Sequence, residues 1–331
     1  MKNEIVFMFS GQGSQYLNMG RELYESLPFF RKQMQHMDEI AELHIGYSIL
    51  DILYHKPPGT AQKFDNILHT HPALLMIQYS VAQCLIHEGI IPNYLLGTSL
   101  GEMVALAVSG VLTPEEAMQI VAKQALLFYK KCPEGGMMAI LEPTQHIQEY
   151  GITASGCELA GINFANHYCI SGSPEALRRT TVQLESRNAI YDYLPVSQPF
   201  HSSLLDPLKT EFLTTFDGIE FKKPEIPVIS SMAAQYLEAF CPDTMWKVVR
   251  DPILFKETLE LFQNGAKNTP YSNTVYLDLG PSGTLANFVK YGLPQSDHFA
   301  THAVMSPFGN DLPKYKSLIL QQGEHTFFKG A

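Results

Sequence analysis

The residues with the clearest capacity for chemistry form the motif Gly97-Thr98-Ser99-Leu100-Gly101. A short apolar run precedes the motif and a helical pattern follows it, as a nucleophile elbow requires. The two glycines allow a sharp turn that exposes the Ser99 hydroxyl at the start of a helix, where the Leu100 N–H is placed to stabilise an oxyanion. The motif therefore predicts a nucleophilic serine. The alternative is a tight strand–helix turn with a capping serine.

A serine nucleophile needs a base that accepts its proton. Among the 12 histidines, His201 is the strongest candidate, because it lies between an extended segment and a helix, which suits a fixed and partly exposed ring. The rival is Asp278 with His298 or His302, which follow the serine in the order typical of α/β-hydrolases. The residues alone leave both pairings open.

The elements that must position these side chains alternate between strands and helices. The apolar run Ile5–Phe9 predicts a buried strand that enters a glycine-rich turn. Pro72 marks a helix start, and so does the capping residue Thr113, because proline and acidic residues follow it. Strands are expected at 5–9, 94–97, 228–230 and 274–278, and helices at 72–87, 100–109, 114–131, 252–264 and 283–291.

The pattern changes in the middle of the chain. Strands are expected at 137–141, 158–163, 168–171 and 189–194, with helices at 145–150 and 174–186. This order, strand–helix–strand–strand–helix–strand, is the ferredoxin-like arrangement. We therefore expect an α/β fold with a hydrolase-like large subdomain, 1-132 and 197-331, and an inserted ferredoxin-like small subdomain, 133-196.

Composition narrows the classes of function. The chain has 331 residues, of which 45% are hydrophobic and 17% charged, so a disordered chain is excluded. The net charge is −10 and basic runs are no longer than two residues, which disfavours nucleic-acid binding. Five widely spaced cysteines argue against a disulfide scaffold and a zinc site. With neither a signal-peptide core nor a membrane-spanning run, we expect a cytoplasmic protein that does not contact membranes.

Four motifs together carry a family resemblance: Phe9-Ser10-Gly11-Gln12-Gly13-Ser14-Gln15, the elbow followed by Glu102, Pro199-Phe200-His201-Ser202, and Leu279-Gly280-Pro281. In sequence and spacing they resemble the malonyl-CoA:acyl-carrier-protein acyltransferases, from about residue 4 to about 310. The inserted ferredoxin-like subdomain also belongs to that family's fold. The resemblance disfavours the α/β-hydrolase esterase, which would require several strands before the elbow.

The resemblance implies a Ser99–His201 dyad that forms an acyl-enzyme, without a metal or another cofactor. It also implies an oxyanion hole made by the backbone N–H groups of Gln12 and Leu100. At Asp251, the family's equivalent residue orients the histidine through its main-chain carbonyl. The implied partner is an acyl carrier protein with a phosphopantetheine-bound acyl group, and acyl-CoA is an alternative thioester.

The sequence departs from the family at two positions. The family usually has histidine where Thr98 stands, and its extender-unit enzymes have an arginine, which binds a free carboxylate, where Gln124 stands. Helical spacing places Gln124 on an otherwise apolar face; the alternative is a half-buried glutamine satisfied by backbone groups. Phe200 and Asn163 complete the substrate-binding candidates, Asn163 against the alternative of a polar turn residue. His167 is expected at the surface.

These departures decide the predicted function. Without the arginine, a buried malonyl carboxylate would lose its charge partner. We therefore expect Ser99-dependent cleavage of acyl groups from acyl-carrier-protein thioesters, as in the free-standing acyl hydrolases that proofread trans-acyltransferase polyketide synthases. The alternative is a trans-acting acyltransferase for non-carboxylated acyl groups, with malonyl less favoured. A nonhydrolytic carrier-binding protein is disfavoured by the intact Ser–His pair.

Overall fold

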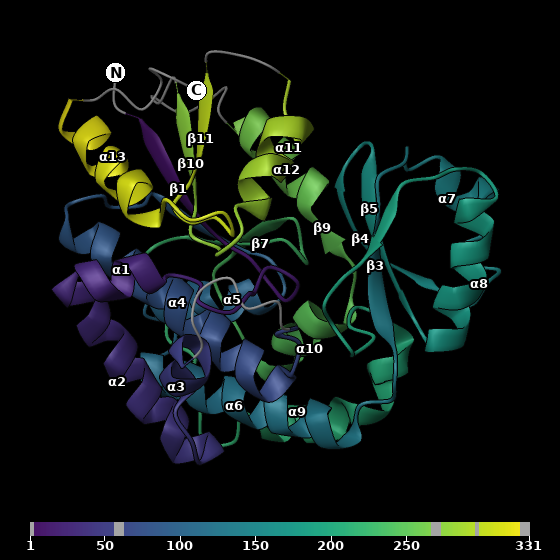
Figure 1. The fold of residues 1–331 in the computed structure, drawn as a ribbon, viewed down its shortest axis with the longest axis horizontal. Coiled ribbons are helices and arrows are strands. Elements are labelled where there is room, and N and C mark those ends of the chain that lie inside the picture. The colour runs from purple at the N-terminus through teal and green to yellow at the C-terminus, as the bar shows by residue number, and fades with distance from the viewer. Residues whose placement is uncertain (1–2, 56–62, 266–272, 295–297, 325–331) are drawn as a thin grey trace.

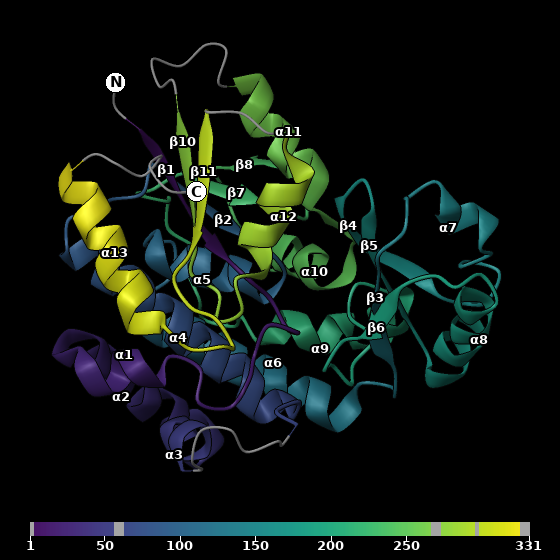
Figure 2. The ribbon, with the colours of Figure 1, turned by 45° about the horizontal axis from the view of Figure 1, so that its top comes forward.

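The computed structural model describes residues 3–55, 63–265, 273–294 and 298–324. Its larger part is built on a sheet of six strands in the order β11-β10-β1-β2-β7-β8 (Figures 1 and 2). All neighbours pair in parallel except β7 and β8. The strands are β1 (Glu4–Phe9), β2 (Tyr94–Gly97), β7 (Val228–Ser230), β8 (Gln235–Leu237), β10 (Thr274–Asp278) and β11 (Phe299–Ala303).

Helices cover both faces of this sheet (Figure 2). Over all of the described residues, including those of the smaller lobe, the helices are α1 (Arg21–Ser26), α2 (Pro28–Ile45), α3 (Ile49–Tyr54), α4 (Ile67–His87), α5 (Leu100–Val108), α6 (Pro114–Lys131), α7 (His146–Glu149), α8 (Pro174–Glu185), α9 (Lys209–Thr214), α10 (Pro242–Arg250), α11 (Phe255–Gly265), α12 (Thr284–Gly292) and α13 (Asp311–Glu324), together with the 3₁₀ helix η1 (Ser203–Leu208). None of the described helices combines the length and the apolar character that a membrane span requires.

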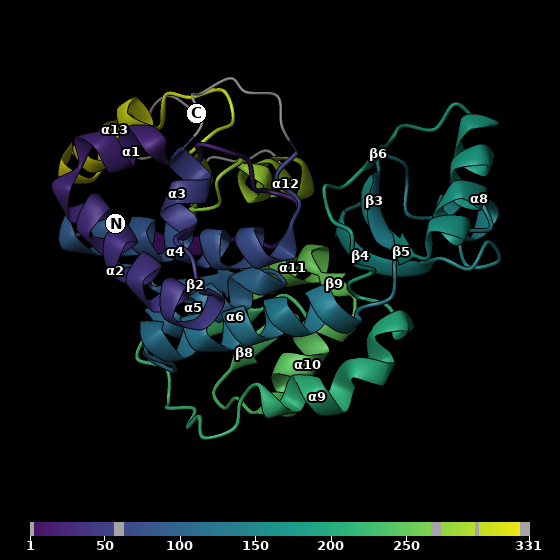
Figure 3. The same ribbon diagram turned by 60° about the horizontal axis from the view of Figure 1, so that its bottom comes forward.

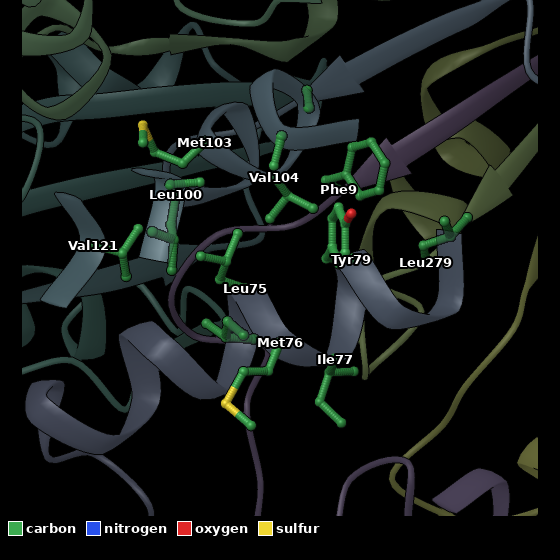
Figure 4. Close-up of a cluster of buried hydrophobic side chains, with 14 of the residues drawn as sticks. Phe9, Leu75, Met76, Ile77, Tyr79, Leu100, Met103, Val104, Val121 and Leu279 are labelled. Carbon is green, nitrogen blue, oxygen red and sulfur yellow. The ribbon is translucent and has the colours of Figure 1, made fainter. Parts of the chain in front are cut away.

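Strand β1 is buried on both faces, and its side chains alternate between two hydrophobic clusters. Its odd-numbered residues pack with α4 and α5, as Figure 4 shows for Phe9 beside Tyr79 and Val104. Val6 and Met8 pack on the opposite face with residues of α11 and α12. The central strands are therefore held rigidly, and the turns at their carboxyl ends are fixed in place.

The α/β expectation is confirmed, but the expected start of α4 was wrong. α4 begins at Ile67, where the Asn66 side chain accepts a hydrogen bond from the Leu68 N–H, so Pro72 lies inside the helix. The five residues before the proline, 67–71, are therefore also helical, which the sequence did not predict. α6 begins as expected, since Thr113 and Glu116 form a reciprocal capping box.

The smaller lobe contains a second sheet, in the order β6-β3-β5-β4-β9. Its strands are β3 (Gly136–Ile140), β4 (Glu158–Phe164), β5 (His167–Gly172), β6 (Tyr191–Tyr193) and β9 (Ile253–Leu254). The first four have the expected ferredoxin-like order and antiparallel pairing. α7 and α8 lie on the side of this sheet away from the larger lobe (Figures 1 and 3).

The fifth strand of the small sheet corrects the sequence reading. The helix expected over 252–264 begins only at Phe255, because Ile253 and Leu254 pair in parallel with β4 at Gly161 and Ile162. β9 thus comes from outside the interval predicted for the small subdomain. Strand β11 and helices α10 and α13 are further elements that the sequence reading did not predict.

Candidate active site

Ser99 lies between the end of β2 and the first residue of α5, in a backbone conformation that is rare for residues with a side chain (φ 53°, ψ −125°). The neighbouring glycines allow the tight turn, since a Cβ on Gly101 would lie 2.0 Å from the Phe9 carbonyl oxygen. On Gly97, a Cβ would lie 2.4 Å from Cα of Glu102. The strand, the turn and the helix therefore match the predicted elbow.

The His201 ring lies directly against the serine. Its Nε2 is 3.0 Å from Ser99 Oγ, and its Nδ1 is 2.8 Å from the backbone carbonyl oxygen of Asp251. Because a carbonyl only accepts, Nδ1 carries the proton and Nε2 is left to accept one from the serine hydroxyl. The Asp251 carbonyl therefore selects the tautomer that a general base needs.

Burial keeps this ring neutral. His201 is 2% exposed, so the expectation of a partly exposed ring was wrong. Burial lowers its pKa to about 4, although the hydrogen bond to the Asp251 carbonyl acts in the opposite direction. At neutral pH the ring is therefore uncharged and able to take a proton.

The rival base lies elsewhere in the fold. Both carboxylate oxygens of Asp278 accept backbone hydrogen bonds, from Gly280 N at 2.8 Å and Ala286 N at 2.9 Å, so this buried side chain secures the entry to α12. His302 lies on β11, the edge strand separated from β2 by β10 and β1. The ring that contacts Ser99 is His201.

The turn after β1 brings Gln12 to the serine. A Cβ on Gly11 would lie 2.8 Å from Cβ of Ser99, so the two segments are in close contact. The Gln12 side chain donates to Thr70 Oγ1 at 2.9 Å and to His71 Nδ1, both at the start of α4. Leu100 is the first residue of α5, where a backbone N–H has no acceptor within the helix.

Two cavities meet at Ser99. The inner cavity has a small free volume, of about 20 Å³. Its lining is largely apolar, with polar groups contributed by three residues besides the serine. The lining residues are Gln12, His71, Ser99, Leu100, Met103, Gln124, Phe200, Phe212, Met245, Val248 and Val249.

Gln124 is almost fully buried (3% exposed) in the wall of this inner cavity. Its Nε2 has no hydrogen-bond partner among the described residues, so the alternative, a half-buried glutamine satisfied by backbone groups, is wrong for the Nε2 donor. Phe200 lies over His71, with ring centroids 5.8 Å apart, and edge-on to Phe128 at 5.2 Å. Phe200 thus packs against both the polar ring of His71 and the apolar ring of Phe128.

His71 is a site residue that the sequence reading missed. It lies immediately before Pro72, where the helix was expected to start, so its place within α4 was not recognised. Burial lowers the pKa of His71 to about 3, and Nδ1 accepts from the Gln12 amide. The ring is therefore neutral and carries its proton on Nε2.

The outer cavity lies between the two lobes and has a larger free volume, of about 190 Å³. Ser99, His201 and Thr98 line one wall, although the Thr98 hydroxyl itself donates to the Phe9 carbonyl at 3.0 Å. Asn163 and His167 line the wall formed by the smaller lobe. The Asn163 Nδ2 lies 2.9 Å from the His167 Nδ1.

His167 corrects another expectation, because it lies in this wall and not at the surface. It is 9% exposed, and its ring centroid lies 5.1 Å from that of Phe288. Burial lowers its pKa to about 4, so it is a neutral group at neutral pH. The adjacent polar residue, Asn166, had suggested exposure.

Comparison with known proteins agrees with this geometry. A family model described as an acyl transferase domain matches residues 6–326. The chain is 38% identical over 312 residues to the polyketide biosynthesis acyltransferase homolog PksD of Bacillus subtilis, and the aligned region covers 94% of each protein.

Solved structures show the same fold. The MCAT of Streptococcus pneumoniae is 27% identical with a TM-score of 0.78, and the match covers 96% of this chain and 100% of that one. A malonyl-transacylase solved in complex with a type II polyketide synthase acyl-carrier protein is 22% identical with a TM-score of 0.81, over 96% and 100% of the two chains. The chain belongs to the acyl transferase domain family and is an enzyme of that family.

Proposed function

We propose that this enzyme acts in polyketide biosynthesis and hydrolyses acyl groups from the phosphopantetheine thioesters of an acyl carrier protein. The observation that carries the acyl-transfer chemistry is the chain of contacts from Ser99 Oγ through the His201 ring to the Asp251 carbonyl, at the junction of two cavities. The similarity to PksD supports the pathway, and the carrier-protein complex of a related fold supports the partner.

In the first step, Ser99 Oγ attacks the thioester carbonyl carbon while Nε2 of His201 takes the hydroxyl proton. The backbone N–H groups of Gln12 and Leu100 stabilise the oxyanion. The C–S bond then breaks, and His201 returns the proton to the leaving thiol. The products of this step are an acyl ester on Ser99 and a free phosphopantetheine thiol.

In the second step, water attacks the ester carbonyl and gives a proton to His201. The bond to Ser99 Oγ breaks, the serine regains the proton, and a free carboxylic acid leaves. The second candidate function differs only here, because a thiol of another carrier protein would replace the water. The enzyme would then be an acyltransferase.

The two cavities divide the substrate between them. The phosphopantetheine arm occupies the outer cavity, along Thr98 and Asn163. The acyl chain enters the inner cavity, along Phe200 towards Gln124. This division places the thioester carbonyl at Ser99, where the two cavities meet.

The charge of the inner cavity selects the acyl group. Gln124 offers an amide, and His71, a titratable residue that lines the same cavity, is neutral because burial lowers its pKa to about 3. A malonyl carboxylate would therefore be buried without a counter-charge, at a cost of several kcal/mol. Acetyl and other uncharged acyl groups avoid this cost.

The function is tested with acetyl and malonyl carrier-protein thioesters at equal concentration, followed by intact-mass measurement of the carrier and the enzyme. We expect an acyl adduct on the peptide that contains Ser99, release of free acid, and faster turnover of acetyl. Ser99→Ala is the control that removes the adduct. An adduct on a cysteine would contradict the mechanism, and faster malonyl turnover would contradict the specificity. Acyl transfer to a second carrier faster than acid release would favour the acyltransferase.

A further inference from the structure

The inner cavity contains a buried hydrogen-bond donor that has no acceptor among the described residues. This donor is Gln124 Nε2. An unsatisfied buried donor is costly, so whatever fills the cavity is favoured if it brings an acceptor oxygen. The free volume of this cavity is large enough for a water molecule.

His71 adds a second donor to the same cavity wall. Since Nδ1 accepts from the Gln12 amide, the proton of the neutral ring is on Nε2. His71 is itself only 4% exposed, and both side chains line the inner cavity. The cavity lining therefore contains two uncharged donors, which suit a neutral acceptor oxygen.

The rest of the lining limits the size and nature of the acyl chain. Met103, Phe200 and Phe212 give the cavity apolar walls around its small free volume. A plain four-carbon chain would exclude water from the cavity and leave Gln124 Nε2 unsatisfied. A chain of the same length with a carbonyl or hydroxyl oxygen would displace the water and also accept the hydrogen bond.

We propose that Gln124, with His71 as a second donor, makes this enzyme selective for short acyl groups that carry an uncharged acceptor oxygen, such as the 3-oxobutanoyl group. This inference rests on the proposed function, because it requires that the acyl chain of a thioester substrate enters the inner cavity. Gln124 acts here as a specificity residue and takes no part in the bond changes at Ser99.

The test compares 3-oxobutanoyl and butanoyl carrier-protein thioesters as acyl donors to Ser99 in rapid-quench intact-mass measurements. The readout is the ratio of the two acylation rates in each variant, relative to wild type, because this cancels the different intrinsic reactivities of the thioesters. An uncharged hydrogen bond is worth about 3- to 10-fold in such a ratio. We expect Gln124→Met to lower the ratio by that factor, through loss of the donor with little change in volume.

Met103→Leu is the matched control, since Met103 lines the same cavity without a donor, and it should leave the ratio within about 2-fold of wild type. If Gln124→Met fails to fold, Gln124→Leu replaces it. A ratio unchanged in the Gln124 variant overturns this inference and leaves the proposed hydrolysis standing, because acid release is measured separately. Failure of all thioesters to acylate Ser99 overturns both.

Discussion

Substitution of Gly11 by alanine tests the close approach of the Gln12 turn to the nucleophile. The added Cβ would lie 2.8 Å from Ser99 Cβ, 3.0 Å from the Thr98 carbonyl oxygen and 3.3 Å from Ser99 Oγ. The first of these contacts is about 0.6 Å short of the 3.4 Å at which ordinary van der Waals contact begins. Gly11 does not adopt a positive φ, so the perturbation is the contact and not the backbone conformation.

Ser99 has little freedom to move away, because β2 and α5 hold it on either side in an unusual backbone conformation with a positive φ. A displacement of about 1 Å at a reacting group costs about 100-fold in rate. A shift of about half that size therefore predicts a loss of about 10-fold or more in kcat/KM for Gly11→Ala. Overpacking should also lower the free energy of unfolding by about 1–3 kcal/mol.

The assay is steady-state release of acetate from acetyl carrier protein, with thermal unfolding measured on the same samples. Gly46→Ala is the contrasting control. Gly46 has φ 91° and no atom within 4 Å of an added Cβ, so this variant should lose stability and retain full activity per folded molecule. A folded Gly11→Ala enzyme with more than half of the wild-type kcat/KM would refute the argument that this contact positions Ser99.

Three further predictions concern the base and the acyl pocket. His201→Ala should lower turnover by about 10²–10⁴-fold while His302→Ala stays near wild type; the reverse ranking would restore the Asp278–His302 pairing. Because burial lowers the pKa of His201 to about 4, kcat/KM should stay level as the pH falls from 8 to about 5 and decline only when the ring becomes protonated; an acid limb near pH 6.5 would show that the ring is not desolvated. Gln124→Arg should raise the malonyl-to-acetyl ratio of acylation rates by at least about 10-fold, and an unchanged ratio would place the acyl tail elsewhere.

Local sequence signals were sufficient for the elbow and for most strands. The glycine at 97 is required by contacts with Gly101 and Glu102 within the turn, whereas the glycine at 101 is required by the close approach of Phe9 on β1. The spacing of the two glycines was nevertheless enough to predict the elbow. The strand at Thr274–Asp278 was likewise predicted with its observed bounds. Periodicity placed Gln124 on a buried face, and the structure places it in the wall of the inner cavity.

Features that depend on distant contacts were not accessible in this way. His71 acquires its place from Gln12 and Phe200, which are far from it in sequence. β9 has only two residues. They form a strand because they pair with β4, whereas the local sequence had predicted that they belong to the helix that follows them. The unsatisfied amide of Gln124 likewise depends on how several helices pack around it.

The short strand β9 has a consequence for building chimeric enzymes. Ile253 and Leu254 pair with β4 of the small sheet, while the Leu254 N–H also donates to the Ser231 carbonyl at 2.7 Å in the large lobe. Two residues before β9, the Asp251 carbonyl holds His201. A graft that exchanges only 133–196 would thus pair a foreign β4 with the resident β9 and disturb the histidine. An interchangeable module must carry the segment 251–254 together with the small subdomain.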